Sequence, residues 1–305
     1  ISSRAAGNPF FAEELARIED LSGYELSALP DTIAAVLTLR LGRLGVACQR
    51  LLSKAAVLGG SFEFQVISAM EANAPNYDED TVLELLEEGL SSGMLTEEGT
   101  GTRITYQFWH PLLSTHLYEH LSAARRANLH RNAAEVMRKL YKNREEENAV
   151  VILHHLVEGG ADEEVIAYYA ELAGNRDCEL SSFPAAENHY HTALDNLGLR
   201  YPDWARLSFL LERLGEIARF RGEFDEARHL YSQSLDMILR HGSKDSSQYQ
   251  QEAQVIAMLL WEIGAVWYSQ GDLAQTRDYN QRAIQVLHEA DTTTGLVWAK
   301  VKLLM

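Results

Sequence analysis

The chain has 305 residues, of which 46% are hydrophobic and 6 are prolines, and its formal net charge at pH 7 is −17. This length can hold two or three domains, and few prolines among many Ala, Leu, Glu and Arg residues predict a mainly α-helical fold. The negative charge repels phosphate backbones and anionic lipid headgroups, so nucleic acids and membrane surfaces are disfavoured as partners.

The two cysteines and the two chain ends indicate a cytoplasmic piece of a longer protein. Cys48 and Cys178 cannot form a disulfide framework, which favours a reducing compartment. No apolar run reaches the roughly 18 residues of a membrane span. The start, "ISSRAAGNPFF", lacks Met and a signal-peptide core, and the end, "VWAKVKLLM", interrupts an apolar periodic segment, so we expect more chain on both sides.

The first segment, residues 1–25, contains "GNPFFAEEL" and has the pattern of an amphipathic helix, in which Pro9 suits the first turn. Residues 26–125 then hold a series of helical patterns. Asp31 is a candidate N-cap. The apolar positions of residues 50–58, "RLLSKAAVL", recur with helical spacing.

A β-hairpin follows the helices of this domain. Phe62–Met70 and Asp78–Gly89 have the patterns of two further helices. Two β-prone arms, Met94–Thr96 and Arg103–Phe108, flank a turn at Glu98–Gly101. Helices followed by such a hairpin have the order of a winged helix.

The helix before the hairpin argues against a DNA-binding role for this winged helix. A helix that reads the major groove needs donors for phosphates and base edges. This helix has no Lys or Arg, and it carries six acidic residues: Asp78, Glu79, Asp80, Glu84, Glu87 and Glu88. A DNA-binding regulator is therefore the weaker alternative.

Residues 126–160 have the pattern of connecting helices, and residues 161–305 have the pattern of tetratricopeptide-like repeats. Three segments align at three repeat positions. The first is glycine in each (Gly174, Gly215, Gly264), the second is a small residue (Ala186, Ala227, Thr276), and the third is tyrosine in two of the three (Tyr190, Tyr231, Asn280). Gly222 and Gly271 mark the turns between helices. The repeat spacings of 41 and 49 residues exceed the roughly 34 of a minimal tetratricopeptide repeat. A last segment, "TTTGLVWAKVKLLM", looks like the first helix of a fourth, truncated repeat.

In this order, "GNPFFAEEL", "LPDTIAAVLTLRLGRL", "LLSKAAVLGGSFEF", "FWHPLLSTHLYEHLSAARRANLH" and the repeats resemble a known family. They are similar to the C-terminal half of bacterial STAND-class signal-transduction ATPases, of the kind fused to nucleotide cyclases, protein kinases or LuxR-type regulators. The resemblance implies an ATPase lid over residues 1–25, a winged helix, and a repeat array that senses a ligand or a protein partner.

The resemblance also implies two contacts with ADP in the full-length protein. Pro9 would lie near the adenine, and His110 would reach the β-phosphate, although Pro111 stands where many relatives carry Asp. An ordinary N1 proline and a capping or packing histidine remain the alternatives. The chain contains no G-x-x-x-x-G-K-[ST] phosphate loop, so we expect no ATP hydrolysis and no bound cofactor in these residues themselves.

The remaining histidines do not predict a metal site. His116 and His120 have the i, i+4 spacing of a zinc pair, but no third ligand is indicated. His154 and His155 are adjacent, so we expect their side chains to diverge, and His130 is expected to pack between the winged helix and the first repeat helix. His189 and His191 likewise lie on different helix faces and have no metal-binding pattern.

No nucleophile has the surroundings of a catalytic residue. Cys48 has no C-x-x-C partner, Cys178 is expected in an inter-helix turn, and Ser181 and Ser182 lack a G-x-S-x-G motif. The sequence therefore predicts a non-enzymatic regulatory and sensor region whose partners are its own ATPase domain and a protein or small-molecule signal. The alternative is a tetratricopeptide scaffold for protein–protein interaction without a switch.

Overall fold

The computed structural model describes residues 32–72, 78–100, 103–197, 203–242 and 246–291. The chain divides into two compact units. Unit 1 contains the chain up to Asn143 together with His154–Gly160, and unit 2 contains Arg144–Leu153 and the chain from Ala161 onward. Pro9, Asp31 and the expected fourth repeat lie outside the described residues.

The described part of the chain is mainly helical, with one small antiparallel sheet. Its elements are α3 (Ile33–Leu41), α4 (Val46–Leu58), β1 (Ser61–Glu63), α5 (Phe64–Glu71), α6 (Glu79–Ser91), β2 (Leu95–Thr100), β3 (Arg103–Phe108), α7 (Pro111–Glu119), α8 (Ala123–Leu140), α9 (Glu145–Gly159), α10 (Glu163–Glu179), α11 (Phe183–Asn196), α12 (Trp204–Arg221), α13 (Phe224–His241), α14 (Ser246–Ser269) and α15 (Leu273–Glu289).

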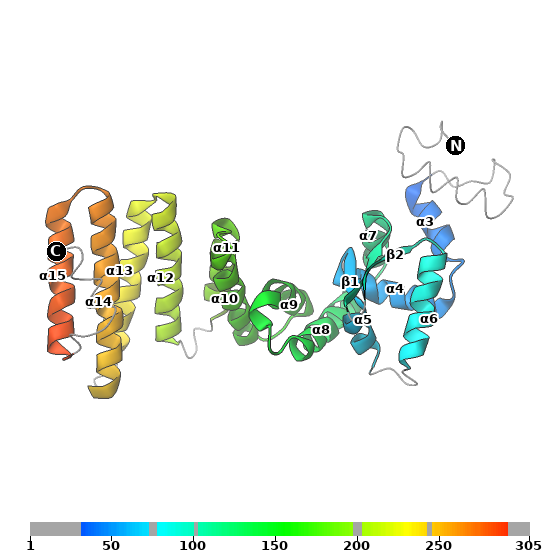
Figure 1. Ribbon diagram of the computed structural model, residues 1–305, viewed down its shortest axis with the longest axis horizontal. Coiled ribbons are helices and arrows are strands. Elements are labelled where there is room, and N and C mark those ends of the chain that lie inside the picture. Colours follow the sequence, from blue (N-terminus) through cyan, green and yellow to red (C-terminus); the bar gives the residue numbers. More distant parts are fainter. Residues whose placement is uncertain (1–31, 73–77, 101–102, 198–202, 243–245, 292–305) are drawn as a thin grey trace. The chain divides into compact units, whose positions relative to one another are not determined.

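Unit 1 contains a winged-helix fold, in which helices α4, α5 and α6 pack with a three-stranded sheet of order β1-β3-β2 (Figure 1). Strand β3 lies in the middle and pairs with both neighbours, for example Phe62 with Tyr106 and Leu95 with Phe108. Leu52, Leu86 and other apolar side chains of the helices form one buried cluster with the inward residues of the sheet. Burial of this cluster is the main stabilising term for the domain.

The structure corrects three local predictions in this unit. The segment predicted as a helix from Phe62 begins with strand β1, since Ser61–Glu63 pair with β3 before the helix starts at Phe64. The predicted turn at Glu98–Gly101 is wrong, because β2 runs on to Thr100 and pairs along its length with β3. The N-cap of α3 is Thr32, whose side chain accepts a hydrogen bond from the amide of Ala35.

Helix α6 presents its acidic side to solvent. Val82, Leu86 and Gly89 are its buried residues, whereas Asp78, Glu79, Asp80, Glu84 and Glu87 are exposed. Glu88 makes a structural contact, because its carboxylate accepts a hydrogen bond of 2.6 Å from the amide of Gly45 at the start of α4. One acidic residue therefore caps a neighbouring helix, and the other five form a solvent-facing surface.

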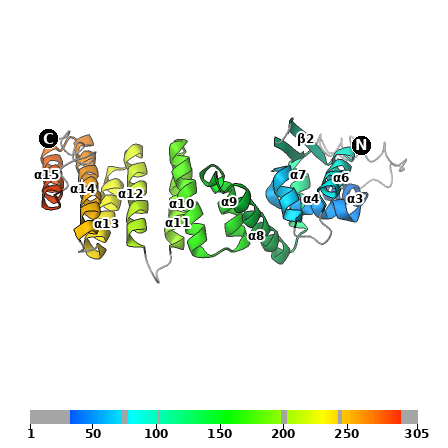
Figure 2. The same ribbon diagram turned by 60° about the horizontal axis from the view of Figure 1, so that its bottom comes forward.

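Unit 2 is built from helix pairs. Helices α10 and α11, α12 and α13, and α14 and α15 pack as three consecutive pairs, and α12 to α15 form a row of neighbouring helices in both ribbon views (Figure 2). Such stacked pairs are typical of a solenoid, in which each pair buries its apolar face on the next. The predicted repeat architecture is confirmed for the described pairs.

The aligned glycines lie where the two helices of a pair approach each other. A Cβ atom placed on Gly174 would come within 2.6 Å of the ring of Tyr190, and one on Gly215 within 2.8 Å of the ring of Tyr231. Both tyrosines are fully buried. Each glycine thus makes room for the tyrosine sixteen positions later, as the repeat alignment predicts.

The inter-helix turns also repeat. Gly222 and Gly271 have positive φ angles of 80° and 82°, which L residues rarely adopt, and the aligned residue of the first pair, Ser181, has a φ of 59°. Cys178 lies in the last turn of α10 and not in the inter-helix turn where it was predicted. Helix α10 ends at Glu179, one residue after Cys178, and the turn begins at its C-cap, Leu180.

None of the helices in the described ranges is both long and apolar enough to cross a membrane.

Candidate functional site

The predicted phosphate sensor, His110, lies at the junction between β3 and α7. It is the N-cap of α7, and Pro111 occupies the first helical position. The Nδ1 atom of His110 accepts a hydrogen bond of 3.2 Å from the amide of Leu112. The half-buried ring is therefore held by the backbone of the helix that it caps.

This contact sets the tautomer of the His110 ring. A neutral imidazole that accepts at Nδ1 carries its hydrogen on Nε2. In this tautomer the Nε2 atom of His110 is an N–H donor, and such a donor can form a hydrogen bond with a phosphate oxygen. The capping role considered in the sequence analysis is observed, and it is compatible with donation to a phosphate.

The half-buried His116 and the exposed His120 contact each other at the end of α7. The Nδ1 atom of His120 donates to the carbonyl oxygen of His116 at 2.7 Å, and the Nε2 atom of His116 lies 3.2 Å from the hydroxyl of Thr38. Burial, followed by the neighbouring His120 ring, lowers the pKa of His116. In the described residues no third metal ligand accompanies this pair.

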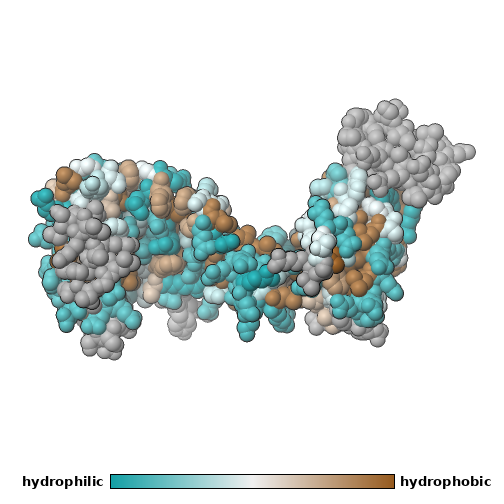
Figure 3. Space-filling view, viewed as in Figure 1, coloured by the Kyte–Doolittle hydropathy of each residue, from teal (hydrophilic) through white to brown (hydrophobic). Residues whose placement is uncertain are grey.

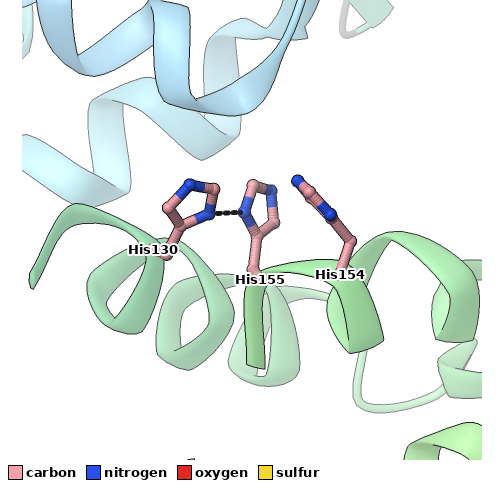
Figure 4. A group of neighbouring side chains, drawn as sticks. All are labelled: His130, His154 and His155. Carbon is pink, nitrogen blue, oxygen red and sulfur yellow. Dashed lines mark hydrogen bonds between the residues drawn. The ribbon is translucent and has the colours of Figure 1, made fainter. Parts of the chain in front are cut away.

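His130, His154 and His155 form a cluster that the sequence analysis did not predict. The expectation that His154 and His155 diverge is wrong, because both rings approach His130, with centroid distances of 5.4 Å and 5.0 Å (Figure 4). His130 and His155 are buried, and His154 is exposed. Adjacent helix positions differ by about 100°, yet the rings of His154 and His155 both turn toward His130 on the neighbouring helix α8. The apolar periodicity of one helix cannot predict this approach, because it depends on how α8 and α9 pack together.

The cysteines are unreactive in this fold. Burial, followed by the charge of Glu88, raises the pKa of the Cys48 thiol to about 12. Burial also raises the pKa of Cys178. A thiol reacts as its thiolate, so neither side chain is a nucleophile near neutral pH.

A cavity of about 540 Å³ lies in unit 2 between α12, α13 and α14. Trp204 and His241 stack at its wall with ring centroids 3.8 Å apart and an interplanar angle of 6°. Asp203, Glu212 and Glu252 also line it, and none of the lining residues that the structure describes is Lys or Arg. The cavity therefore combines an aromatic wall with three acidic residues, of which Glu212 is paired with Arg213 at 3.2 Å.

Sequence analysis did not single out this cavity. Its lining residues come from three helices, and each is an ordinary residue on its own helix: Trp204 opens α12, His241 ends α13, and Glu252 lies in α14. Only the packing of the helices brings them together. Its volume lies within the usual range for small-molecule sites, which makes it the candidate ligand site of the repeats.

Comparison with known proteins finds no matching family model and no matching curated protein. Among solved structures, the chain is similar to BtubC (BKLC) from P. vanneervenii, with 17% identity, coverage of 87% of this chain and 95% of that chain, and a TM-score of 0.41. It is also similar to a signal transduction ATPase with numerous domains, a STAND protein with a tetratricopeptide repeat sensor, from Pyrococcus horikoshii. That match has 12% identity and a TM-score of 0.41, and it covers 99% of this chain but 55% of the other. Likenesses at this level assign neither a family nor an activity to the chain.

Proposed function

We propose that this chain is the regulatory and sensor portion of a STAND-type ATPase, in which the helical repeats bind the activating signal. The cavity between α12, α13 and α14 carries this proposal, because it offers a concave ligand site within the repeats. The ordered motifs and the winged helix that precedes the repeats support the assignment to this class of switch.

The lining of the cavity favours a cationic signal. Three carboxylates, those of Asp203, Glu212 and Glu252, line a site whose described wall lacks a basic residue. Trp204, which stacks on His241 with one face, adds aromatic surface, and aromatic faces attract ammonium and guanidinium groups, as the guanidinium of Arg213 over the ring of Phe209 illustrates. A polyamine or the Arg or Lys side chain of a partner peptide has this chemistry.

Calorimetric titration of the chain with spermidine and with N-acetyl-arginine amide tests this site. We expect saturable binding that weakens with rising salt, since it depends on charge. The variant Ala205→Trp places a large side chain at the cavity wall, and it should remove binding. Ala274→Trp changes an equally exposed alanine of α15, away from the cavity, and should leave binding intact. The proposal would be contradicted if neither spermidine nor N-acetyl-arginine amide bound to the parent chain. Equal binding by Ala205→Trp and Ala274→Trp would contradict it as well.

The same proposal gives His110 a role in nucleotide-dependent switching. Its oriented Nε2–H group donates to the β-phosphate of ADP in the intact ATPase, while Pro9 lies near the adenine. Signal binding favours one of two packings of the protein and so biases ADP release, which requires different affinities for the two states. The chain alone has no phosphate loop. We therefore expect purified chain to show no ATP turnover and no tight ADP binding.

Substitutions at His110 separate capping from phosphate contact. Serine is a strong N-cap residue, so His110→Ser keeps α7 capped but removes the ring donor, whereas His110→Ala removes both. In the intact ATPase, both variants should lose bound ADP faster than the parent and raise basal activity. If His110→Ser retains ADP as the parent does, the ring has only a structural role.

A protein–protein scaffold without a switch is the second candidate. Large apolar side chains such as Phe220, Leu239 and Tyr268 are exposed on the repeats. On the face drawn in Figure 3, however, the described repeat surface is mostly hydrophilic with scattered apolar atoms. Large partner interfaces usually have a contiguous apolar patch. Unchanged ADP retention in both His110 variants would favour the scaffold.

A further inference from the structure

We propose that the cluster of His130, His154 and His155 binds a divalent transition-metal ion of the zinc class. In this site His154 and His155 are the two protein ligands and water would complete the coordination. His130 supplies the third imidazole of the cluster, which the pair of His116 and His120 lacks, and acts as a positioning residue that orients His155. The proposal is independent of the proposed sensor role, because it uses residues of unit 1 and neither the cavity nor nucleotide.

The geometry brings three imidazoles into one small volume. One ring nitrogen from each histidine lies within 4.8 Å of those of the other two. Figure 4 shows the ring of His155 between the rings of His130 and His154. Two nitrogens bound to one zinc ion are about 3.3 Å apart, given Zn–N bonds of about 2.0–2.1 Å. The exposed side chain of His154 can make this small adjustment by rotation, and its exposure gives the ion a path to the site.

Hydrogen bonds define the role of each ring. The Nε2 atom of His130 lies 3.1 Å from the hydroxyl of Tyr118, and its Nδ1 atom lies 2.8 Å from Nδ1 of His155. When His130 carries its hydrogen on Nε2, the Tyr118 oxygen accepts it. The Nδ1 lone pair of His130 then accepts the Nδ1–H of His155.

This arrangement leaves the Nε2 lone pair of His155 free. That atom is buried, and in the described chain it has no hydrogen-bond partner. In Figure 4 it lies on the edge of the ring that faces His154. Ligating histidines usually donate their other N–H to an acceptor that fixes the tautomer, as His155 does to His130. A metal ion beside His154 would supply the missing partner.

Burial disfavours the protonated form of the two buried rings, His130 and His155, and a metal ion binds the neutral imidazole. Burial, followed by the charges of the other two histidines, lowers the pKa of His155 to about 3. Burial also lowers the pKa of His130, where Glu158 acts in the opposite direction and Arg126 in the same direction. The carboxylate of Glu158 favours a cation, and Arg126 opposes it.

Titration of the metal-free 305-residue chain with Zn²⁺ by calorimetry tests the site. We expect one saturable ion per chain and no comparable binding of Mg²⁺, which prefers oxygen ligands. His154→Ala should abolish this binding without lowering the melting temperature, because its side chain is exposed. Two matched controls, His120→Ala and His229→Ala, remove exposed imidazoles outside the cluster and should bind as the parent does.

The role of His130 has a separate readout. Glutamine can accept the Nδ1–H of His155, whereas leucine cannot, so His130→Leu should raise the dissociation constant for Zn²⁺ about tenfold or more relative to His130→Gln. Equal affinities in these two variants would overturn the positioning role. No saturable Zn²⁺ binding by the parent chain, binding retained in His154→Ala, or binding lost in His120→Ala would overturn the site itself.

Discussion

At the scale of single residues, the repeat glycines show how one hydrogen atom in place of a methyl group decides the packing of a helix pair. Glycine inside a helix costs about 1 kcal/mol relative to alanine, so its presence at Gly174 and Gly215 needs a compensating reason. The structure supplies it, since the rings of Tyr190 and Tyr231 occupy the space where a Cβ atom would lie. Tertiary packing outweighs helix propensity at these positions.

Replacing Gly215 should therefore destabilise the protein despite the gain in helix propensity. Gly215→Leu should lower the free energy of unfolding by about 1–3 kcal/mol, because the side chain overpacks the contact with Tyr231. Gly215→Ala should also destabilise, but by less. Gly264→Ala is the matched control, because there the nearest atom, Oδ1 of Asn280, would be 3.1 Å from the new Cβ. Urea unfolding measures the difference, and equal stabilities for the two alanine variants would refute this account.

Another residue-scale prediction concerns acid. Burial, followed by the neighbouring His130 and His154, lowers the pKa of His155 in the folded protein to about 3, from the usual value of about 6.5. The unfolded chain therefore binds more protons below pH 6.5, and the stability of the folded state falls as the pH decreases through that value. Between pH 7.5 and pH 5, this one group should cost about 2 kcal/mol.

The acid prediction is tested by comparison with a variant, since the many carboxylates of the chain also titrate. His155→Gln removes the titrating ring, so its free energy of unfolding should depend less on pH between 5 and 7.5 than that of the parent. Urea denaturation at both pH values measures this. Identical pH dependence would contradict the buried, neutral state of His155.

At the scale of elements, the turn of the first helix pair contains a residue that is poorly suited to it. Ser181 has the left-handed conformation that glycine adopts at the aligned positions 222 and 271. A residue with a Cβ atom in this conformation costs about 1–2 kcal/mol. The turn between α10 and α11 is therefore a local weakness of the repeats.

Exchanging residues between the two turns should have opposite effects. Ser181→Gly should raise the free energy of unfolding by about 0.5–1 kcal/mol, and Gly222→Ser should lower it by a similar or larger amount. Melting temperatures of both variants measure the effect. A decrease in both would show that the hydroxyl of Ser181 contributes more than its backbone conformation costs.

The elements also show what the sequence can predict. The helix pairs, the Gly–Tyr contacts and the start of α6 follow from periodicity and small-residue spacing, which are local signals. Strand β1 was missed because three residues carry no alternation pattern, and only pairing with β3 makes them a strand. The cavity and the histidine cluster were missed because each joins residues from different helices, and tertiary packing, like the pairing of β1, is not a local signal.

At the scale of the whole molecule, each unit has its own apolar core. The cluster around Leu52 and Leu86 lies in unit 1, and a second cluster around Tyr231 and Leu260 lies in unit 2. A domain with its own core can unfold as its own cooperative unit. The stability of this chain is then described by two free energies and not by one.

Calorimetry should therefore resolve two unfolding transitions. Gly215→Leu should lower the melting temperature of one transition, and Leu86→Ala should lower that of the other, since a buried leucine truncated to alanine costs about 2–5 kcal/mol. Each variant serves as the control for the other. A single transition that shifts in both variants would show that the two cores unfold together.

The close contact between glycine and tyrosine also restricts the order in which the repeats can change during evolution. An alanine at Gly174 or Gly215 would meet an aromatic ring, so the tyrosine must become smaller before the glycine can be replaced. The third pair has the combination expected of such an intermediate, with Gly264 beside Asn280 at the position of the tyrosine. Among divergent copies of this repeat, we expect glycine with a small partner to be frequent, and a larger residue beside an intact tyrosine to be rare.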